Sequence, residues 1–273
     1  ADGLESFVPQ YSMVAAILLT LMSVGTLIYF LHHIPETINV SNISAALGRR
    51  LARGIERIID NHAERTPEPE VQPAKNATET ELSLGRAGYI QQLDLTGLFE
   101  LAEENDWVVH VAVEIGSFVS MYETVLTVYS ASAPTADQCD SLCSSFAVGE
   151  EQTEAQDITF MIDQLVEMLA RALSPGVNDP FTALNCLNWL RNGISVALQY
   201  KGGLAPVPRA RVQYRSLTLQ HLLNISFRAA APYCMPDKMA RDHWMFSVRS
   251  LMDAATGEHK KTVAKLLEEF EKA

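Results

Sequence analysis

A stretch of 27 residues without a single Asp, Glu, Lys or Arg, from Phe7 to His33, constrains this chain more than any other feature. Its most apolar part, residues 13–31, contains 19 residues. A helix of that length rises about 28 Å, which is close to the thickness of the hydrocarbon layer of a bilayer. A signal peptide would begin with basic residues, whereas Asp2 and Glu5 precede the stretch. We therefore predict a transmembrane segment over residues 1–35.

The basic residues near this segment predict its orientation. No Lys or Arg precedes the segment, whereas four arginines follow it: Arg49, Arg50, Arg53 and Arg57. Because positively charged flanks of a span tend to stay in the cytoplasm, we expect the C-terminal bulk of the chain to be cytoplasmic. The chain also begins at Ala1 rather than at a methionine, which is typical of a portion of a longer or processed protein.

Residues 36–61 are predicted to form an amphipathic juxtamembrane helix. Apolar residues recur at helical spacing from Ile43 to Ile59, and the four arginines occupy the other face. That basic face could rest on anionic lipid headgroups. A helix packed on a neighbouring subunit or domain explains the same pattern. Residues 62–84 contain three prolines and few apolar residues, so we expect a linker there.

The remainder of the chain changes from a strand pattern to a helical one. Apolar residues alternate at Val109, Val111 and Val113 and recur near Val125, with a turn candidate at Gly116 between the two runs. We predict a small β-rich module over residues 85–130, which serves either as a ligand platform or as a packing module. A helical cytoplasmic domain is predicted over residues 131–273, with helices near 151–172, 180–200, 216–231, 236–256 and 258–271. The predicted fold class is an α+β membrane protein.

Charge and composition narrow the possible partners and cofactors. The formal net charge is -12, so the chain offers no broad positive surface to a phosphate backbone and we expect no nucleic acid partner. Cys139 and Cys143 would share one helical face and could join a metal site or pair under oxidation. Two local ligands do not make a site, and we expect no metal and no other cofactor.

Catalytic motifs are absent from the sequence. It contains no nucleophile elbow, Walker loop, dinucleotide fingerprint, HExxH or EF-hand loop. Carboxylate pairs at helical spacing, Glu154 with Asp157 and Asp163 with Glu167, are typical of solvated helix faces. A non-catalytic role is therefore favoured, although the sequence leaves catalysis open.

Residues 172–184, with the sequence ALSPGVNDPFTAL, form the most informative segment. Asp179 followed by Pro180 is a strong helix start, because Asp accepts hydrogen bonds from first-turn amides and Pro gives up only an amide without a partner. A rigid corner between two helices explains most of these residues. The alternative is a site for a small polar or charged ligand at the helix N-terminus, built from Ser174, Asn178, Asp179 and Thr182.

Four segments of the chain resemble a known family. Besides residues 172–184, they are residues 150–175, which include Gln156, Asp157 and Phe160, GYIQQLD at 88–94, and FLHHI at 30–34. Together they resemble the bacterial predicted membrane protein family that carries the label domain of unknown function 2254. The resemblance covers most of the chain. It implies an integral protein of the bacterial inner membrane, supplies no established activity, and implies a C-terminal portion, since family members usually carry several spans before this point.

The chain departs from the family pattern at two places. Gln152 stands where the family has an arginine, and Ile115-Gly116-Ser117 stands where the family has Pro-Gly-Asp in a hairpin turn. The resemblance therefore implies no role here for that arginine or that aspartate.

Three functional classes fit the sequence. We favour an oligomeric membrane assembly that forms or regulates a path for ions or small solutes, with the cytoplasmic domain as its regulator. The alternatives are a membrane-anchored ligand-binding or sensor protein, and an accessory subunit of a larger membrane complex. Small and polar residues on one face of the span suit either a pore or helix packing: Ser12, Ala16, Thr20, Ser23 and Thr26. The expected partners are the lipid bilayer and other copies of the chain, with a larger membrane complex as a further possibility.

Overall fold

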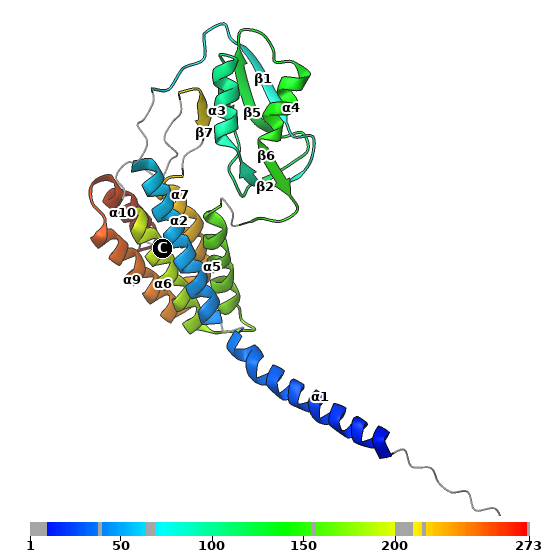
Figure 1. Ribbon diagram of the computed structural model, residues 1–273. Coiled ribbons are helices and arrows are strands. Elements are labelled where there is room, and N and C mark those ends of the chain that lie inside the picture. The colour runs from blue at the N-terminus through cyan, green and yellow to red at the C-terminus, as the bar shows by residue number, and fades with distance from the viewer. Residues whose placement is uncertain are drawn as a thin grey trace, which may run out of the picture. The chain divides into compact units, whose positions relative to one another are not determined.

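The computed structural model describes residues 10–37, 40–63, 69–153, 157–199, 210–214 and 217–271. The chain divides into two compact units, Ala1–Ile43 and Ser44–Ala273. Figure 1 shows the course of the chain, with the elements labelled.

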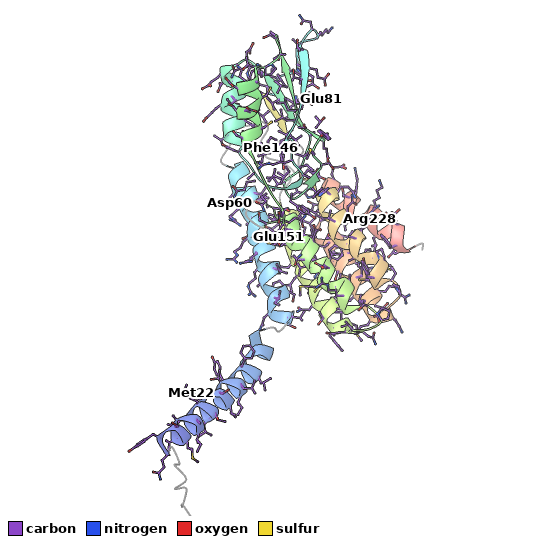
Figure 2. The ribbon with its side chains drawn as sticks, turned by 90° about the vertical axis from the view of Figure 1, so that its right-hand side faces the viewer. Met22, Asp60, Glu81, Phe146, Glu151 and Arg228 are labelled. Carbon is purple, nitrogen blue, oxygen red and sulfur yellow. The ribbon has the colours of Figure 1, made fainter. Side chains whose placement is uncertain are left out.

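The first unit is dominated by helix α1 (Gln10–Thr37), which is blue in Figure 1. Residues Gln10–Leu31 are long and apolar enough to cross a membrane, and none of that stretch is buried inside the structure; Met22, labelled in Figure 2, is 67% exposed. The hydroxyls of Thr20 and Thr26 each donate to a carbonyl oxygen four residues earlier, at 2.8 Å. These two hydroxyls therefore need no partner outside the helix in an apolar environment.

The second unit contains a helical bundle with its own hydrophobic core. Helix α2 (Val40–Ala63) enters the bundle, where Leu51 and Ile55 are fully buried. Trp244 is also fully buried, and its indole N–H donates to the carbonyl oxygen of Phe227 at 2.9 Å. The other bundle elements are α5 (Thr159–Ala172), α6 (Pro180–Ala197), α7 (Leu219–Leu223), the π-helical turn η1 (Asn224–Arg228), α8 (Ala229–Cys234), α9 (Lys238–Ala254) and α10 (Gly257–Glu271).

Helix α2 packs against α6 at short range because glycines line the contact. Gly48 lies on Trp189, and a methyl group at Gly48 would come within 2.6 Å of Trp189 Cβ. Further along, Gly193 of α6 lies on Leu51 of α2. These contacts advance in the same direction along both helices, so α2 and α6 run parallel. The apolar face of α2 is thus covered by helices of the same chain, and its four arginines are exposed.

A second hydrophobic core lies in the β-rich part of this unit. Two sheets have the strand orders β1-β5-β3-β7 and β4-β2-β6. Phe146, labelled in Figure 2, is one of the largest side chains buried there. The elements are β1 (Thr78–Ser83), β2 (Gly88–Leu93), α3 (Leu95–Glu104), β3 (Val108–Val111), β4 (Phe118–Val119), β5 (Thr124–Ser130), α4 (Ala136–Ser144), β6 (Phe146–Gly149) and β7 (Val212–Tyr214).

The predicted hairpin is present, with additions that the sequence pattern did not indicate. β3 and β5 pair antiparallel, and Val109 lies opposite Val128. Among the described residues, three further strands lie outside residues 85–130, namely β1, β6 and β7. β1 falls in the segment predicted as a linker, because its residues TETELS offer no apolar alternation to an edge position. β7 has only three residues and pairs parallel to β3, so local periodicity could not reveal it.

The charged residues are distributed unevenly between these parts. Residues 78–149, which contain most of the strands, include 11 acidic residues and a single basic one, Arg86. Residues 150–273 include 14 acidic and 14 basic residues. Nearly all of the net negative charge therefore resides in the β-rich part.

The close contact between α2 and α6 predicts the effect of adding one methyl group. Gly48→Ala should destabilise the protein by about 1–2 kcal/mol, because overpacking against Trp189 outweighs the higher helix propensity of Ala. Thermal unfolding would show this as a midpoint lower by roughly 2–6 °C. Gly176→Ala is the matched control, since Gly176 has no neighbouring atom within 4 Å of an added methyl group. Equal midpoints for the two variants would contradict the packing described here.

Candidate functional site

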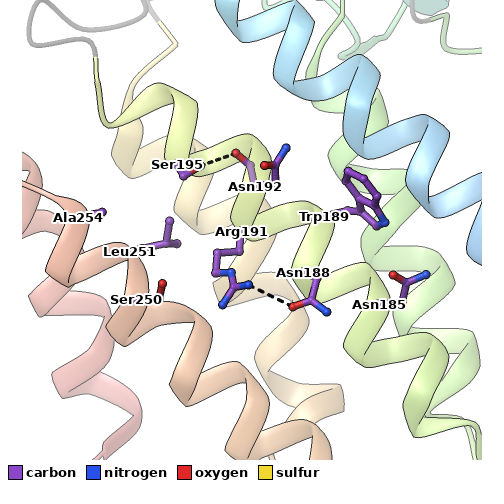
Figure 3. A pocket seen from close by; sticks show the side chains of 9 residues that line it. All are labelled: Asn185, Asn188, Trp189, Arg191, Asn192, Ser195, Ser250, Leu251 and Ala254. Carbon is purple, nitrogen blue, oxygen red and sulfur yellow. Dashed lines mark hydrogen bonds between the residues drawn. The ribbon is translucent and has the colours of Figure 1, made fainter.

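Polar side chains on α6 line an open hollow beside α9 (Figure 3). Its volume of about 500 Å³ lies in the range of small-molecule sites. The hollow is lined by Asn185, Asn188, Trp189, Arg191, Asn192, Ser195, Ser250, Leu251 and Ala254. Three of these residues are asparagines that recur at helical spacing along α6, so their amides line one face of the helix.

Hydrogen bonds hold part of this polar lining in place. The side-chain oxygen of Asn188 lies 2.9 Å from His243 Nε2 and 3.5 Å from a guanidinium nitrogen of Arg191. Burial lowers the pKa of His243, and the nearby charge of Arg191 lowers it further, so the neutral imidazole is favoured. At the opposite end of the lining, the Ser195 hydroxyl donates to the carbonyl oxygen of Asn192 at 2.7 Å.

The electrostatic character of the hollow comes from Arg191. Its guanidinium carbon lies 5.1 Å from the centre of the Phe246 ring, a cation–π contact that holds the side chain over α9. Within the part of the chain that the structure describes, no carboxylate lies at ion-pair distance from Arg191. The lining contains amides, hydroxyls and one guanidinium but no Asp or Glu. This combination favours an anionic or hydrogen-bond-accepting group over a cation.

The predicted corner residues form local hydrogen bonds. Asp179 caps α6: its carboxylate accepts from the Thr182 backbone N–H at 3.2 Å and from the Thr182 hydroxyl at 2.5 Å. These hydrogen bonds lower the pKa of Asp179. The Ser174 hydroxyl instead donates to the carbonyl oxygen of Arg171, and Asn178 adopts a left-handed conformation with φ of 49°. The structure thus brings Asp179 and Thr182 together in a cap, and ligand binding by the four residues remains a prediction.

The remaining predicted candidates occupy two other helices. Arg49, Arg50, Arg53 and Arg57 are exposed on α2, and the Arg49 guanidinium carbon lies 5.8 Å from the centre of the Trp189 ring. Cys139 and Cys143 both lie on α4, and burial raises the pKa of the Cys143 thiol. Among the described residues, no three His, Cys, Asp or Glu side chains are arranged to hold a metal ion.

A buried carboxylate lies where the β-rich part meets the bundle, and the sequence interpretation of it was wrong. Asp157 was expected on a solvated helix face but is only 3% exposed and precedes the first turn of α5. One carboxylate oxygen accepts from the backbone N–H and hydroxyl of Thr159, at 2.8 and 2.5 Å. The other oxygen is buried and has no hydrogen-bond partner within the described ranges. A methyl group at Gly116, where φ is 87°, would overlap that oxygen.

Segments far apart in the sequence converge on this carboxylate. The Gln152 amide donates to the carbonyl oxygen of Gly116 at 2.9 Å. The backbone of Ile90 pairs with the same turn, since its N–H donates to Ser117 at 3.0 Å and its carbonyl oxygen accepts from Gly116 at 2.8 Å. Gln152 and the Gly116 turn are therefore in direct contact. Sequence spacing gave no sign of this contact, although a glycine in the turn was a local signal.

Comparison with known proteins identifies the family of this chain. The family model described as "Predicted membrane protein (DUF2254)" matches residues 1–246. The chain belongs to this family. Two relatives of this DUF2254 chain are uncharacterised proteins of Mycobacterium bovis (strain ATCC BAA-935 / AF2122/97) and Mycobacterium tuberculosis (strain ATCC 25618 / H37Rv). Each is 27% identical over 193 residues, which cover 69% of this chain and 37% of the relative.

The chain thus spans little more than a third of the length of these relatives. No solved structure matches it. The family resemblance inferred from the sequence is confirmed, and the family description agrees with the one helix, α1, that is long and apolar enough to span a membrane among the described residues.

The buried carboxylate predicts an unusual dependence of stability on pH. Burial raises the pKa of Asp157 above its ordinary value of about 3.9. A group with a raised folded-state pKa destabilises the protein as pH rises from the unfolded pKa through the folded one. Asp157→Asn keeps the oxygen that accepts from Thr159 and removes this charge. The variant should therefore gain thermal stability relative to wild type as pH rises from 4 to 7, and a difference that is constant with pH would contradict this account.

The cap at Asp179 predicts a different result. Asp179→Asn should change the free energy of unfolding by less than about 0.5 kcal/mol at pH 7, because Asn is nearly as good an N-cap, whereas Asp179→Ala should cost about 1 kcal/mol. Chemical denaturation measures both values. If the corner also binds a ligand through its carboxylate, Asn and Ala should impair binding equally, which separates that role from capping.

Proposed function

We propose that this DUF2254 member is a membrane-anchored binding protein whose helical bundle takes up a small anionic ligand. In this proposal α1 anchors the chain in the bacterial inner membrane, and the bundle and the β-rich part are cytoplasmic. The arginines that follow α1 support this orientation. The hollow on α6 would then face the cytoplasm, where small organic anions and phosphate are available.

One observation carries the proposal: the hollow on α6 combines a guanidinium, which has no carboxylate at ion-pair distance among the described residues, with a row of amides and no acidic lining residue. The chain as a whole is strongly acidic. A hollow whose charged side chain is basic, on a chain that is acidic as a whole, is typical of a binding site for an anion rather than of a solvated surface. The Trp189 ring adds an apolar wall to the same hollow.

An oligomeric path for ions or small solutes has less support. The sequence argument for association used the apolar face of α2, and that face is covered by α6 of the same chain. The hydroxyls of Thr20 and Thr26 are satisfied within α1. Homo-oligomerisation and membership of a larger membrane complex therefore remain proposals without a contact in this structure that requires them.

Simple anions test the binding proposal directly. Inorganic phosphate and succinate, at tenfold above a millimolar Kd, should stabilise the purified chain by about 1.4 kcal/mol, equivalent to roughly 2–4 °C in the unfolding midpoint. Sodium chloride of equal ionic strength should not. Arg191→Gln should remove the stabilisation.

Arg249→Gln is the matched control, because Arg249 lies on α9 and pairs with Glu271 at 2.8 Å outside the hollow. It should keep the response to both anions. Identical responses of the two variants would show that Arg191 does not bind the anion and would overturn the proposal.

A further inference from the structure

The corner between α5 and α6 exposes large apolar side chains. Val177 is 61% exposed and Phe181 is 71% exposed. Phe181 is among the most exposed aromatic residues of the bundle, although apolar residues of this size normally gain free energy from burial.

The backbone of this corner is well ordered by hydrogen bonds. The N–H groups of Val177 and Asn178 both donate to the carbonyl oxygen of Ser174, at 3.1 and 2.9 Å, and the Asp179 N–H donates to Ala172 at 2.8 Å. The left-handed Asn178 completes the turn. The chain therefore holds these apolar side chains at the surface, where the described residues leave most of each side chain uncovered.

The corner lies at the end of the bundle where α2 begins (Figure 1). The amide of Asn185, in the second turn of α6, donates to the Ser44 hydroxyl at 2.9 Å. Because α2 and α6 run parallel from this point, the first turns of both helices share one end of the bundle. The corner immediately precedes α6 and belongs to the same end.

Chain connectivity limits the distance between that end and the apolar stretch of α1. Leu31 ends the apolar stretch of α1, and Ser44 follows it after 13 residues. Even a fully extended chain of that length spans at most about 45 Å. With α1 in the bilayer, a second and weaker contact made by the corner is intramolecular. Its effective concentration is set by the length of this connection.

We propose that the corner, through Val177 and Phe181, docks into the headgroup region of the bilayer in which α1 is anchored. The amphipathic chemistry fits this occupant, since aromatic and aliphatic side chains enter the boundary between headgroups and acyl chains. Arg49 and Arg50 are exposed within two turns of Ser44 and favour anionic headgroups. Asp179 is the one acidic residue in 173–182, and its carboxylate is engaged by Thr182.

The charge distribution favours docking through the corner over docking through the β-rich part. With 11 acidic residues against one basic residue, residues 78–149 are repelled by an anionic surface. The corner lies in the near-neutral part of the chain. This docking uses the membrane anchor of the proposed function but not the hollow on α6.

Fluorescence from an added tryptophan tests the docking. The full chain carrying Phe181→Trp is reconstituted into vesicles of phosphatidylcholine and phosphatidylglycerol with brominated acyl chains, and the signal of the parent protein is subtracted. We expect the added fluorescence to fall about twofold relative to vesicles without bromine, as for a side chain at the acyl boundary. Tyr122→Trp is the matched control, because Tyr122 is an 86% exposed aromatic residue of the β-rich part, and its added fluorescence should not be quenched.

Companion measurements identify the occupant. Val177→Asp in the Phe181→Trp background should restore the emission, since a charge in the corner opposes insertion. If the added tryptophan is shielded from acrylamide yet unquenched by bromine, protein rather than lipid covers the corner and the docking proposal is overturned. Equal quenching of the Phe181 and Tyr122 variants also overturns it. Flotation of the chain with the vesicles is measured separately. A chain that does not float contradicts both the anchoring by α1 and the docking, whereas a chain that floats without quenching contradicts the docking alone.

Discussion

The close contact between α2 and α6 is the interaction on which the rest of this structure depends. Glycines at 48 and 193 remove side chains from the contact, and Trp189 and Leu51 occupy the space. This contact holds α2 on the helical bundle. The asparagines of α6 lie beside this contact, and Asn185 takes part in it through its hydrogen bond to Ser44 of α2.

Two hydrophobic cores share one polypeptide, and polar groups join them. Asp157 reaches from the start of α5 to the Gly116 turn of the β-rich part. His221 of α7 lies 3.8 Å from Glu114 in the same turn. A junction made of titratable and polar groups is weaker than continuous apolar packing, so the two parts can respond differently to pH and to ligands.

The sequence predicted the elements whose pattern is local. Helical periodicity identified the C-terminal helices, the Asp179-Pro180 start of α6 and the amphipathic α2, and alternation identified β3 and β5. β1 and β7 escaped because one carries acidic alternation at an edge and the other is three residues long. Asp157 was misassigned because its burial depends on a turn 41 residues away in the sequence. The asparagine row of α6 was hidden because it interleaves with the apolar residues that identified the helix.

The concentration of acidic residues in the β-rich part has a consequence for encounters between copies of the chain. With 11 acidic residues and one basic residue in residues 78–149, each copy presents a like-charged lobe to its neighbours. Such lobes repel over a Debye length of about 8 Å at physiological ionic strength. In a chain anchored as proposed, this repulsion opposes close lateral packing of the β-rich parts in the plane of the bilayer, and it weakens as the salt concentration rises.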